Sequence, residues 1–265
     1  MNNMLLAIDI GNTHTVFGIY QGEHLAADWR VTSNLQRTED EVGAQLHQFL
    51  RGAGIEMKHI AAVGISSVVP NLTDVFDAMA RKYFKVDPIV VTSKLDLGLK
   101  IHYDDPGSVG ADRLCNSVAG FAKYGGPLII IDFGTATTYD LVASNGDYLG
   151  GVIAPGIETS AADLHRRAAK LPKIELRFPG KIIATDTVSS MQAGILYGAV
   201  DALEGMVRRL QEGLKDREKK QPKVIATGGF SKLMSDHSPT IEACEPTLVL
   251  DGVRLICERV RRSRD

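Results

Sequence analysis

Two stretches of the chain repeat one arrangement of apolar runs and a short polar turn. Residues 4–8 and 128–131 are continuous apolar runs, which are typical of strands buried on both faces. Each run leads into Asp-x-Gly and small hydroxyl residues, followed by a second apolar run at 16–20 or 139–142. In both stretches this pattern predicts a strand, a tight turn and an antiparallel strand. Asp9 and Asp132 open the two turns and are separated by close to half of the 265 residues.

The remaining periodicities predict an α/β fold. Further strands are expected at residues 24–31, 60–65, 89–91, 147–153 and 224–226. Helices are expected at 38–52, 71–84, 110–124, 162–168, 187–215 and from 251 to the end. Thr38 and Glu41 form a capping box at the start of the first helix. Because no low-complexity linker separates the halves, we expect two lobes packed on each other, residues 1–120 and 121–265.

The chemistry of the two turns favours phosphate binding. Glycine lets the backbone approach a ligand closely, and backbone N–H groups with threonine hydroxyls suit a small anion. An aspartate at the strand end suits a metal ion beside that anion. One copy alone would be an ordinary hairpin whose Asp and Thr satisfy their own turn. Repetition at half length instead predicts two facing copies that bind a nucleotide polyphosphate.

Composition excludes several other classes of protein. A net charge of −2 without a clustered basic surface argues against nucleic-acid binding. Cys115, Cys244 and Cys257 have no ligand-like spacing, which argues against a disulfide framework or a zinc site. Cys115 and Cys257 fall in apolar helical patterns and are predicted to be core residues. We find no apolar run long enough to span a membrane and no signal-peptide pattern, so a cytoplasmic location is expected.

Seven motifs, in order, resemble those of the type III pantothenate kinases, within the actin, hexokinase and sugar-kinase ATPase superfamily. They are residues 9–13, 66–70, 110–113, 132–138, 151–156, 191–195 and 226–229. The family has Gln-Ser-Gly where this chain has Gln192-Ala193-Gly194, and Asn-Thr where it has Asp186-Thr187. The resemblance implies two similar ribonuclease-H-like lobes, with mixed five-stranded sheets flanked by helices and the nucleotide in the interlobe cleft.

The resemblance also implies a reaction. The family phosphorylates pantothenate with ATP to give 4'-phosphopantothenate, the first step of coenzyme A biosynthesis. Its cofactors are Mg²⁺ with ATP and a monovalent cation, K⁺ or NH₄⁺. Its members are homodimers that bind the substrate near the interface.

The family's functional residues transfer to matching positions of this sequence. The implied ATP-binding residues are Asp9, Ile10, Gly11, Asn12, Thr13, His14, Thr15, Val16 and Thr135. The implied pantothenate-binding residues are Tyr103, Gly110, Ala111, Asp112, Arg113 and Thr187. Asp112 matches the proton acceptor, Asp132 the monovalent-cation site, and Asp9 the magnesium site, directly or through water.

Each assignment has a purely structural alternative. Asp112 fits the N-cap of a helix that begins at Arg113, and Arg113 fits a surface ion pair. Tyr103 fits a ring that packs in a loop, and Thr187 fits the cap of the long helix. Gly228 suits packing on adenosine or a simple turn of the chain.

Two other functions fit the same fold. Another kinase or a phosphatase of the superfamily would keep both phosphate turns but not the arrangement of Tyr103 with residues 110–113. A non-catalytic nucleotide-binding regulator would show damage at Asp9, Asp112 or Asp132, and all three are intact. The intact aspartates favour the kinase.

Overall fold

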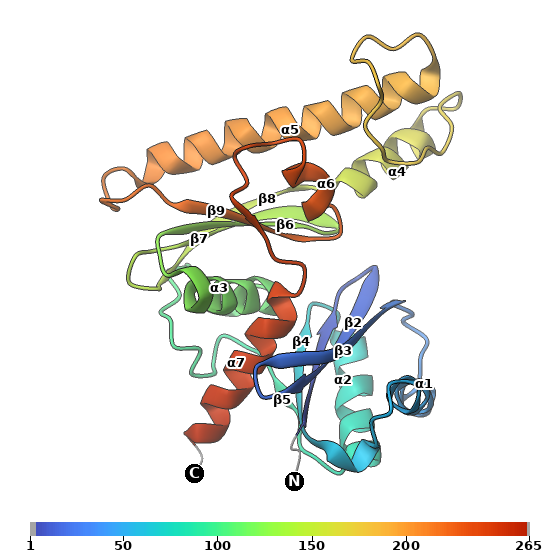
Figure 1. The fold of residues 1–265 in the computed structure, drawn as a ribbon, viewed down its shortest axis with the longest axis vertical. Helices are drawn as coiled ribbons and strands as arrows, with labels where there is room; N and C mark the ends of the chain where they lie inside the picture. Colours follow the sequence, from blue (N-terminus) through green and yellow to red (C-terminus); the bar gives the residue numbers. More distant parts are fainter. Residues whose placement is uncertain (1–3, 264–265) are drawn as a thin grey trace. The chain divides into compact units, whose positions relative to one another are not determined.

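A computed structural model describes residues 4–263, which form two compact units (Figure 1). The first unit contains the residues up to Lys123 together with those from Thr247 onward, and the second is Tyr124–Pro246. Each unit has one five-stranded mixed sheet with helices packed on it. The expected fold class of two similar α/β lobes is therefore confirmed, whereas the position of a nucleotide stays a prediction.

The first sheet has the strand order β3-β2-β1-β4-β5. Its strands are β1 (Met4–Ile10), β2 (His14–Gln21), β3 (His24–Thr32), β4 (Ile60–Ser67) and β5 (Ile89–Val90). β2 is antiparallel to both β1 and β3, whereas β4 is parallel to β1 and β5. The first predicted turn thus joins the antiparallel strands β1 and β2, and β1 also pairs with the parallel strand β4.

The second sheet has the order β10-β9-β6-β7-β8 and repeats this topology. Its strands are β6 (Leu128–Phe133), β7 (Ala136–Val142), β8 (Tyr148–Pro155), β9 (Lys223–Gly228) and β10 (Ala243–Cys244). When β6 is matched to β1, every pairing has the same direction as its counterpart. The repeated sequence pattern therefore reflects a duplicated sheet. β10 has only two residues, too few for a pattern to predict it.

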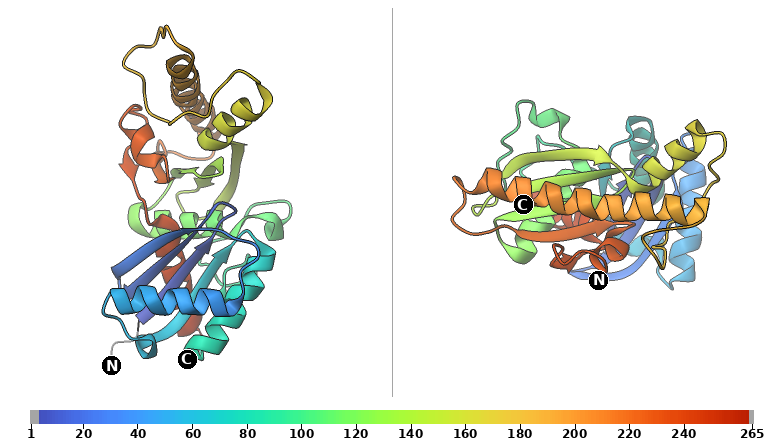
Figure 2. Two further views of the ribbon diagram at one scale, coloured as in Figure 1. Left: turned by 90° about the vertical axis from the view of Figure 1, so that its right-hand side faces the viewer. Right: turned by 90° about the horizontal axis from the view of Figure 1, so that it is seen from above.

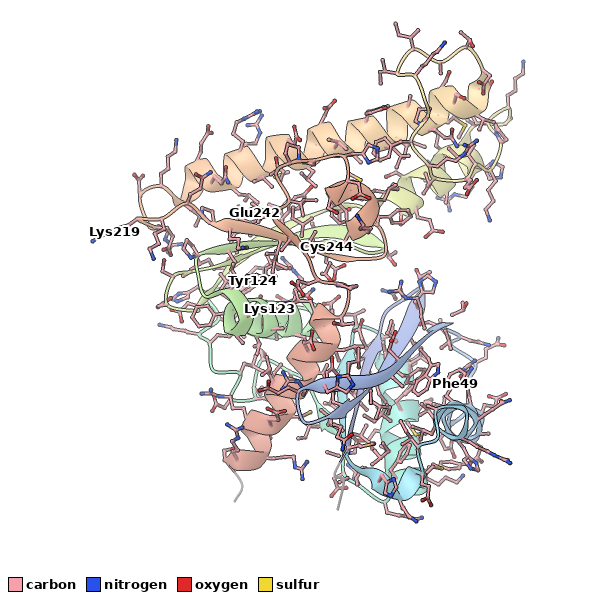
Figure 3. The ribbon with its side chains drawn as sticks, in the orientation of Figure 1. Phe49, Lys123, Tyr124, Lys219, Glu242 and Cys244 are labelled. Atoms are coloured by element: carbon pink, nitrogen blue, oxygen red, sulfur yellow. The ribbon has the colours of Figure 1, made fainter. Side chains whose placement is uncertain are left out.

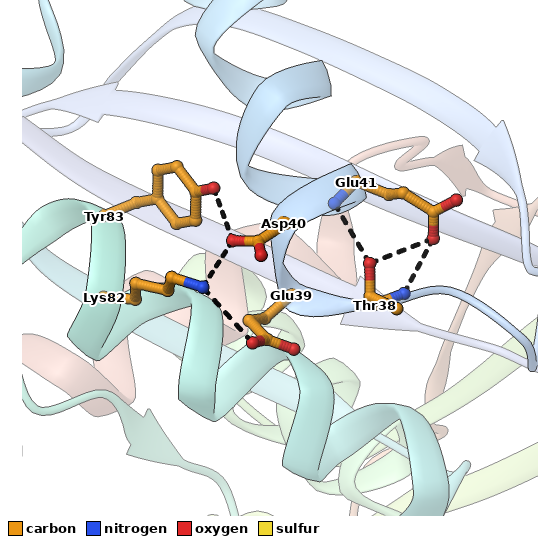
Figure 4. A network of polar contacts seen from close by, with 6 residues as sticks. All are labelled: Thr38, Glu39, Asp40, Glu41, Lys82 and Tyr83. Atoms are coloured by element: carbon orange, nitrogen blue, oxygen red, sulfur yellow. Dashed lines mark hydrogen bonds and ion pairs between the residues drawn. The ribbon is translucent and has the colours of Figure 1, made fainter.

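Local signals set the helix ends in the first unit. Its helices are α1 (Glu39–Gly52), α2 (Pro70–Met79), α3 (Ala111–Tyr124), which ends at the boundary, and α7 (Leu248–Arg262). The predicted capping box is present: Glu41 N–H donates to Thr38 Oγ1 at 3.4 Å, and Thr38 N–H donates to Glu41 Oε2 at 2.8 Å (Figure 4). In place of one helix over 71–84, α2 gives way to the π-helical turn η2 (Ala80–Phe84).

A polar network joins α1 to η2 (Figure 4). Asp40 accepts from Tyr83 Oη at 2.6 Å and forms an ion pair with Lys82 Nζ at 2.6 Å. The apolar face of α1 turns to the sheet, and it carries Phe49, which is labelled in Figure 3. The Phe49 ring stacks on Trp29 of β3 with ring centroids 5.3 Å apart. The only tryptophan of the chain is therefore a packing residue.

One long helix covers a face of the second sheet. The helices of this unit are α4 (Ile157–Arg167), α5 (Thr187–Leu214) and α6 (Ser231–Ser235). Leu196 and Leu203 of α5 pack on Ile131 and Val224 of the strands, and the view from above in Figure 2 shows α5 crossing the sheet. Short 3₁₀ turns, η1 (Met57–His59) and η3 (Pro106–Ser108), complete the elements of the described chain. None of the helices within residues 4–263 is long and apolar enough to span a bilayer.

The position of α7 differs from the expected division into residues 1–120 and 121–265. α7 packs on β1 and β4 and so joins the first unit. A Cβ atom on Gly64 of β4 would lie 2.4 Å from Cys257 Sγ, and one on Gly252 would lie 2.2 Å from the Cys115 carbonyl oxygen. Cys115 and Cys257 are buried, as predicted. Close packing against residues far away in the sequence therefore decides where α7 belongs.

We predict that Gly252→Ala destabilises the first unit. The added methyl group meets the backbone of α3 rather than a mobile side-chain end. Overpacking of this kind costs roughly 1–3 kcal/mol, which exceeds the gain of about 1 kcal/mol in helix propensity. Urea unfolding measures the change. Gly213→Ala is the control, since no atom lies within 4 Å of its Cβ position on α5. An unfolding midpoint of Gly252→Ala equal to that of the wild type would contradict the prediction.

Candidate functional site

The first aspartate lies near the end of β1 and is oriented by a neighbouring strand. Asp9 lies near the end of β1, opposite Val16 on β2 and Ser66 on β4. The buried Ser66 hydroxyl donates to Asp9 Oδ1 at 3.0 Å. The carboxylate itself is only half-buried. Its orientation at the mouth of the turn is therefore set by a strand more than fifty residues further along the chain.

The turn between β1 and β2 exposes three side chains. Gly11 N–H donates to the His14 carbonyl oxygen at 3.0 Å and closes the turn. Asn12, Thr13 and His14 are exposed. A Cβ atom on Gly11 would lie 3.1 Å from the same carbonyl oxygen, so glycine keeps this turn tight. Asn12, Thr13 and His14 thus lie where a small anion can reach their side chains.

Two other predicted members of the turn have buried side chains. Ile10 belongs to the core, and Thr15 is 1% exposed. Thr15 Oγ1 lies 2.9 Å from Ser33 Oγ, so its hydroxyl has an internal partner. This differs from the expectation that the threonine hydroxyls face an anion, because Thr15 already belongs to the strand. Val16 is half-buried on β2.

The second turn is supported by the start of α4. Gly134 N–H donates to the Ala136 carbonyl oxygen at 3.1 Å, and Thr135 is exposed. The Thr135 carbonyl oxygen accepts from Gly156 N–H at 3.2 Å and from Thr159 Oγ1 at 2.6 Å. A Cβ atom on Gly156 would lie 2.3 Å from that oxygen. Gly156, in one of the motifs, is therefore needed for close packing.

Asp132 faces a glycine on the neighbouring strand. The register places Thr227 opposite Asp132 and Gly228 opposite Phe133. Gly228 has φ +86°, and a Cβ atom there would lie 2.5 Å from Asp132 Oδ1. Gly228 was expected either to pack on adenosine or to turn the chain. The turn and its close contact with Asp132 already require glycine here, without any contact with adenosine. Glycine at position 228 therefore leaves room for the half-buried carboxylate of Asp132.

Asp112 lies in the first turn of α3. The helix begins at Ala111, so Asp112 is inside the helix and is not the N-cap of a helix that begins at Arg113. Asp112 Oδ1 accepts the Arg113 N–H at 2.8 Å, and a Cβ atom on Gly110 would lie 2.5 Å from the same oxygen. Burial raises the pKa of the Asp112 carboxyl above the ordinary value of 3.8, although the Arg113 N–H and the Arg113 charge oppose this change.

The residues around Asp112 are buried to different extents. Arg113 is 6% exposed, so the alternative of a surface ion pair is wrong. Ala111 is also buried, whereas Tyr103 is 38% exposed in the loop that precedes η3. Tyr103 and residues 110–113 all belong to the first unit.

Thr187 lies in the second unit as the first residue of α5. The N-cap is Asp186, whose carboxylate accepts Ser189 N–H at 2.9 Å, so Thr187 does not cap the helix. Asp186 therefore caps α5. Thr187 lines an open hollow of about 770 Å³ together with residues such as Leu164 and Met191.

Sequence reasoning missed two supporting residues. Ser66 lies within one of the motifs, and its strand position near a sheet edge was the available signal. Ser33 contacts the first turn through Gly11 and Thr15, yet no pattern around it suggested such a contact. Gln192, another motif residue, is buried and donates to the Glu175 carbonyl oxygen at 2.8 Å, which anchors the loop before α5.

Solved structures share this fold at low sequence identity. A conserved putative Baf family transcriptional activator from Campylobacter jejuni has a TM-score of 0.59 and 16% identity, over 97% of this chain and 99% of that one. A putative N-acetylglucosamine kinase from Chromobacterium violaceum has a TM-score of 0.50 and 14% identity, over 96% and 99% of the two chains. The resemblance is one of fold, which includes sugar-kinase structures.

Sequence comparison is more specific. The model of the type III pantothenate kinase family matches residues 5–209. A type III pantothenate kinase from Geotalea daltonii is 47% identical over 260 residues, which cover 98% of this chain and all of the relative. Together with the two duplicated turns and the intact aspartates, these matches lead to one conclusion: the chain belongs to the type III pantothenate kinase family.

Proposed function

We propose that the chain transfers the γ-phosphoryl group of ATP to the primary hydroxyl of pantothenate, with Asp112 as the proton acceptor. The product is 4'-phosphopantothenate, and the reaction is the first step of coenzyme A biosynthesis. Membership of the family supports the activity. The observation that supports the role of Asp112 is its half-buried carboxyl at the start of α3, next to the buried Arg113.

A raised pKa makes Asp112 a stronger base than an ordinary aspartate. Burial destabilises its negative charge and favours uptake of a proton. The hydroxyl of pantothenate loses its proton as the phosphoryl group is transferred, so a nearby carboxylate assists the step. General base catalysis supplies roughly 10²- to 10⁴-fold, and positioning and charge neutralisation supply the rest.

Neighbouring residues suit the other parts of the acceptor. The planar guanidinium of Arg113 matches the carboxylate of pantothenate in shape and charge. Tyr103 is exposed in the preceding loop, where it is accessible to a ligand. Thr187, in the hollow of the second unit, contributes a hydroxyl to the same substrate in this proposal.

The two turns bind ATP in this proposal. Asn12, Thr13 and His14 of the first turn and Thr135 of the second are exposed, so a phosphate group can reach their side chains. Ile10, Thr15 and Val16 contribute through the backbone and by shaping the turn. Neither turn contains lysine or arginine, so bound cations supply positive charge at the turns in this proposal.

The residues present fit such cations. Asp9 offers a carboxylate oriented by Ser66, and carboxylate and phosphate oxygens together are the ligands that Mg²⁺ prefers. Asp132 offers a half-buried carboxylate near the end of β6, which suits a monovalent cation, K⁺ or NH₄⁺. When bound, these ions neutralise phosphate charge. Asp9 and Asp132 would hold them at the ends of β1 and β6.

The test of the proposal is release of ADP in a coupled assay with ATP, Mg²⁺ and pantothenate. We expect pantothenate-dependent turnover with K⁺ or NH₄⁺, and at least about tenfold less when Na⁺ replaces them, because a cation at Asp132 supplies charge that the protein lacks. Asp132→Asn should remove the cation dependence together with most of the activity. Asp236→Asn, which removes an exposed carboxylate paired with Lys232, is the matched control.

Three outcomes are informative in that assay. Turnover that is equal in K⁺ and Na⁺ would contradict the proposed cation site but not the proposed kinase activity. Turnover with another small alcohol and none with pantothenate would point to a different metabolite kinase. No turnover with any cation would contradict the proposed function.

We predict that Asp112→Asn lowers kcat by roughly 10²- to 10⁴-fold with little change in the KM for ATP. In the wild type, Asp112 acts as the carboxylate, so kcat/KM for pantothenate is lost as the pH falls through its pKa. Because burial raises that pKa, the acidic limb should lie above the ordinary value of 3.8. Asp74→Asn, on the exposed side of α2, serves as the control. A variant that keeps its activity would place the base elsewhere.

We further propose a homodimer that forms around the α4–α5 end of the second unit. Exposed apolar side chains gather in the segments around the hollow that contains Thr187; they are Leu164, Ile182, Ile183 and Val188. Ile183 is 82% exposed, so a charge there should not affect folding of the single chain.

We expect Ile183→Glu to shift the protein to monomers and to raise the KM for pantothenate, since a charge opposes burial of this surface. Sedimentation equilibrium measures the mass. Leu35→Glu, at a 63% exposed leucine of the first unit, should remain dimeric. A monomeric wild type, or a dimeric Ile183→Glu, would contradict this interface.

A further inference from the structure

One residue outside all the sequence motifs supports the first turn. Ser33 directly follows β3, and it lies beside the turn because Thr32 pairs with His14 across β3 and β2. The Ser33 N–H donates to the Thr13 carbonyl oxygen at 2.9 Å. The Ser33 hydroxyl donates to the Gly11 carbonyl oxygen at 2.6 Å. Ser33 therefore contacts the turn on both sides of Asn12.

The protons determine the direction of the remaining hydrogen bond. A serine hydroxyl has one proton, and Ser33 uses it for Gly11. Thr15 Oγ1 lies 2.9 Å from Ser33 Oγ, so Thr15 is the donor in this contact. The buried hydroxyl of Thr15 thus orients Ser33, and Ser33 in turn orients the Gly11 carbonyl.

The Gly11 carbonyl and the Asn12 N–H belong to one peptide group. In a trans peptide these two bonds point in opposite directions. With the carbonyl held toward Ser33, the Asn12 N–H points away from Ser33, and Asn12 is exposed. Glycine at position 11 otherwise permits the peptide to rotate, because it tolerates conformations closed to other residues. A rotated peptide would present a carbonyl oxygen where an anion needs a donor.

We infer that Ser33 is a positioning residue for the phosphoryl donor: it holds the Gly11–Asn12 peptide so that the Asn12 N–H is available to a nucleotide phosphate. The inference rests on the proposed role of this turn in ATP binding. It assigns Thr15 an indirect role, in which the hydroxyl supports Ser33. It also explains why a buried threonine suits a turn that binds an anion.

The experiment compares Ser33→Ala with Ser33→Thr, which keeps a hydroxyl, in the ADP-release assay. Ser33→Ala should raise the KM for ATP about tenfold, the effect of one lost hydrogen bond, and leave the KM for pantothenate within about twofold. Ser33→Thr should recover most of the ATP affinity. Ser263→Ala is the matched control, because it removes a hydroxyl that donates to the Val260 carbonyl oxygen at 2.8 Å, at the end of α7. It should behave as the wild type does.

Thr15→Val provides a second test, at the donor side of the hydrogen bond to Ser33. Valine keeps the shape of threonine and removes only the donor to Ser33. We expect a smaller rise in the KM for ATP than in Ser33→Ala. A rise as large as that of Ser33→Ala, or larger, would mean that the Thr15 hydroxyl binds phosphate directly, and would overturn the inference.

The remaining outcomes separate this inference from the proposed function. An active wild type with an unchanged KM for ATP in Ser33→Ala overturns the role of Ser33 and leaves the kinase intact. Equal rises in the KM values for ATP and pantothenate, with a lower midpoint of thermal unfolding, would reduce Ser33 to a structural residue and overturn the inference. A wild type without pantothenate-dependent turnover contradicts the proposed function itself.

Discussion

Parallel pairing of β1 with β4, and of β6 with β9, is the interaction on which the rest of the structure depends. Parallel strands end at the same edge of a sheet, so the residues that follow them meet there. In the first unit this pairing places Ser66 beside Asp9 and orients the carboxylate. In the second it places Gly228 against Asp132. The turn of each antiparallel hairpin lies at the same edge. The aspartate, the turn and the end of the neighbouring strand therefore lie close together.

Close packing against glycine positions oxygen atoms of three candidate site residues. A Cβ atom on Gly110, Gly156 or Gly228 would lie within 2.5 Å of an oxygen of Asp112, Thr135 or Asp132, respectively. These glycines therefore leave the space in which site oxygens are held. Burial raises the pKa of the Asp112 carboxyl, and the adjacent Arg113 opposes that change.

The sequence by itself determined the features that depend on neighbouring residues. The apolar runs and the Asp-x-Gly turns predicted the duplicated hairpins, because buried strands and tight turns each have a local signature. The capping box at Thr38 was predicted for the same reason and is present. The order of the motifs along the chain indicated the family, and both comparisons of sequence agree with it.

Only the tertiary structure decided features that depend on distant residues. Nothing local placed α7 in the first unit, where Gly252 packs on the backbone of Cys115. No local sequence pattern predicted that Arg113 is buried. None predicted that Ser33 contacts a turn that lies about twenty residues earlier in the chain. Hydrophobic patterns record whether a side chain is buried but carry no information about which partner buries it, and a hydrogen bond between strands exists only once their register is formed.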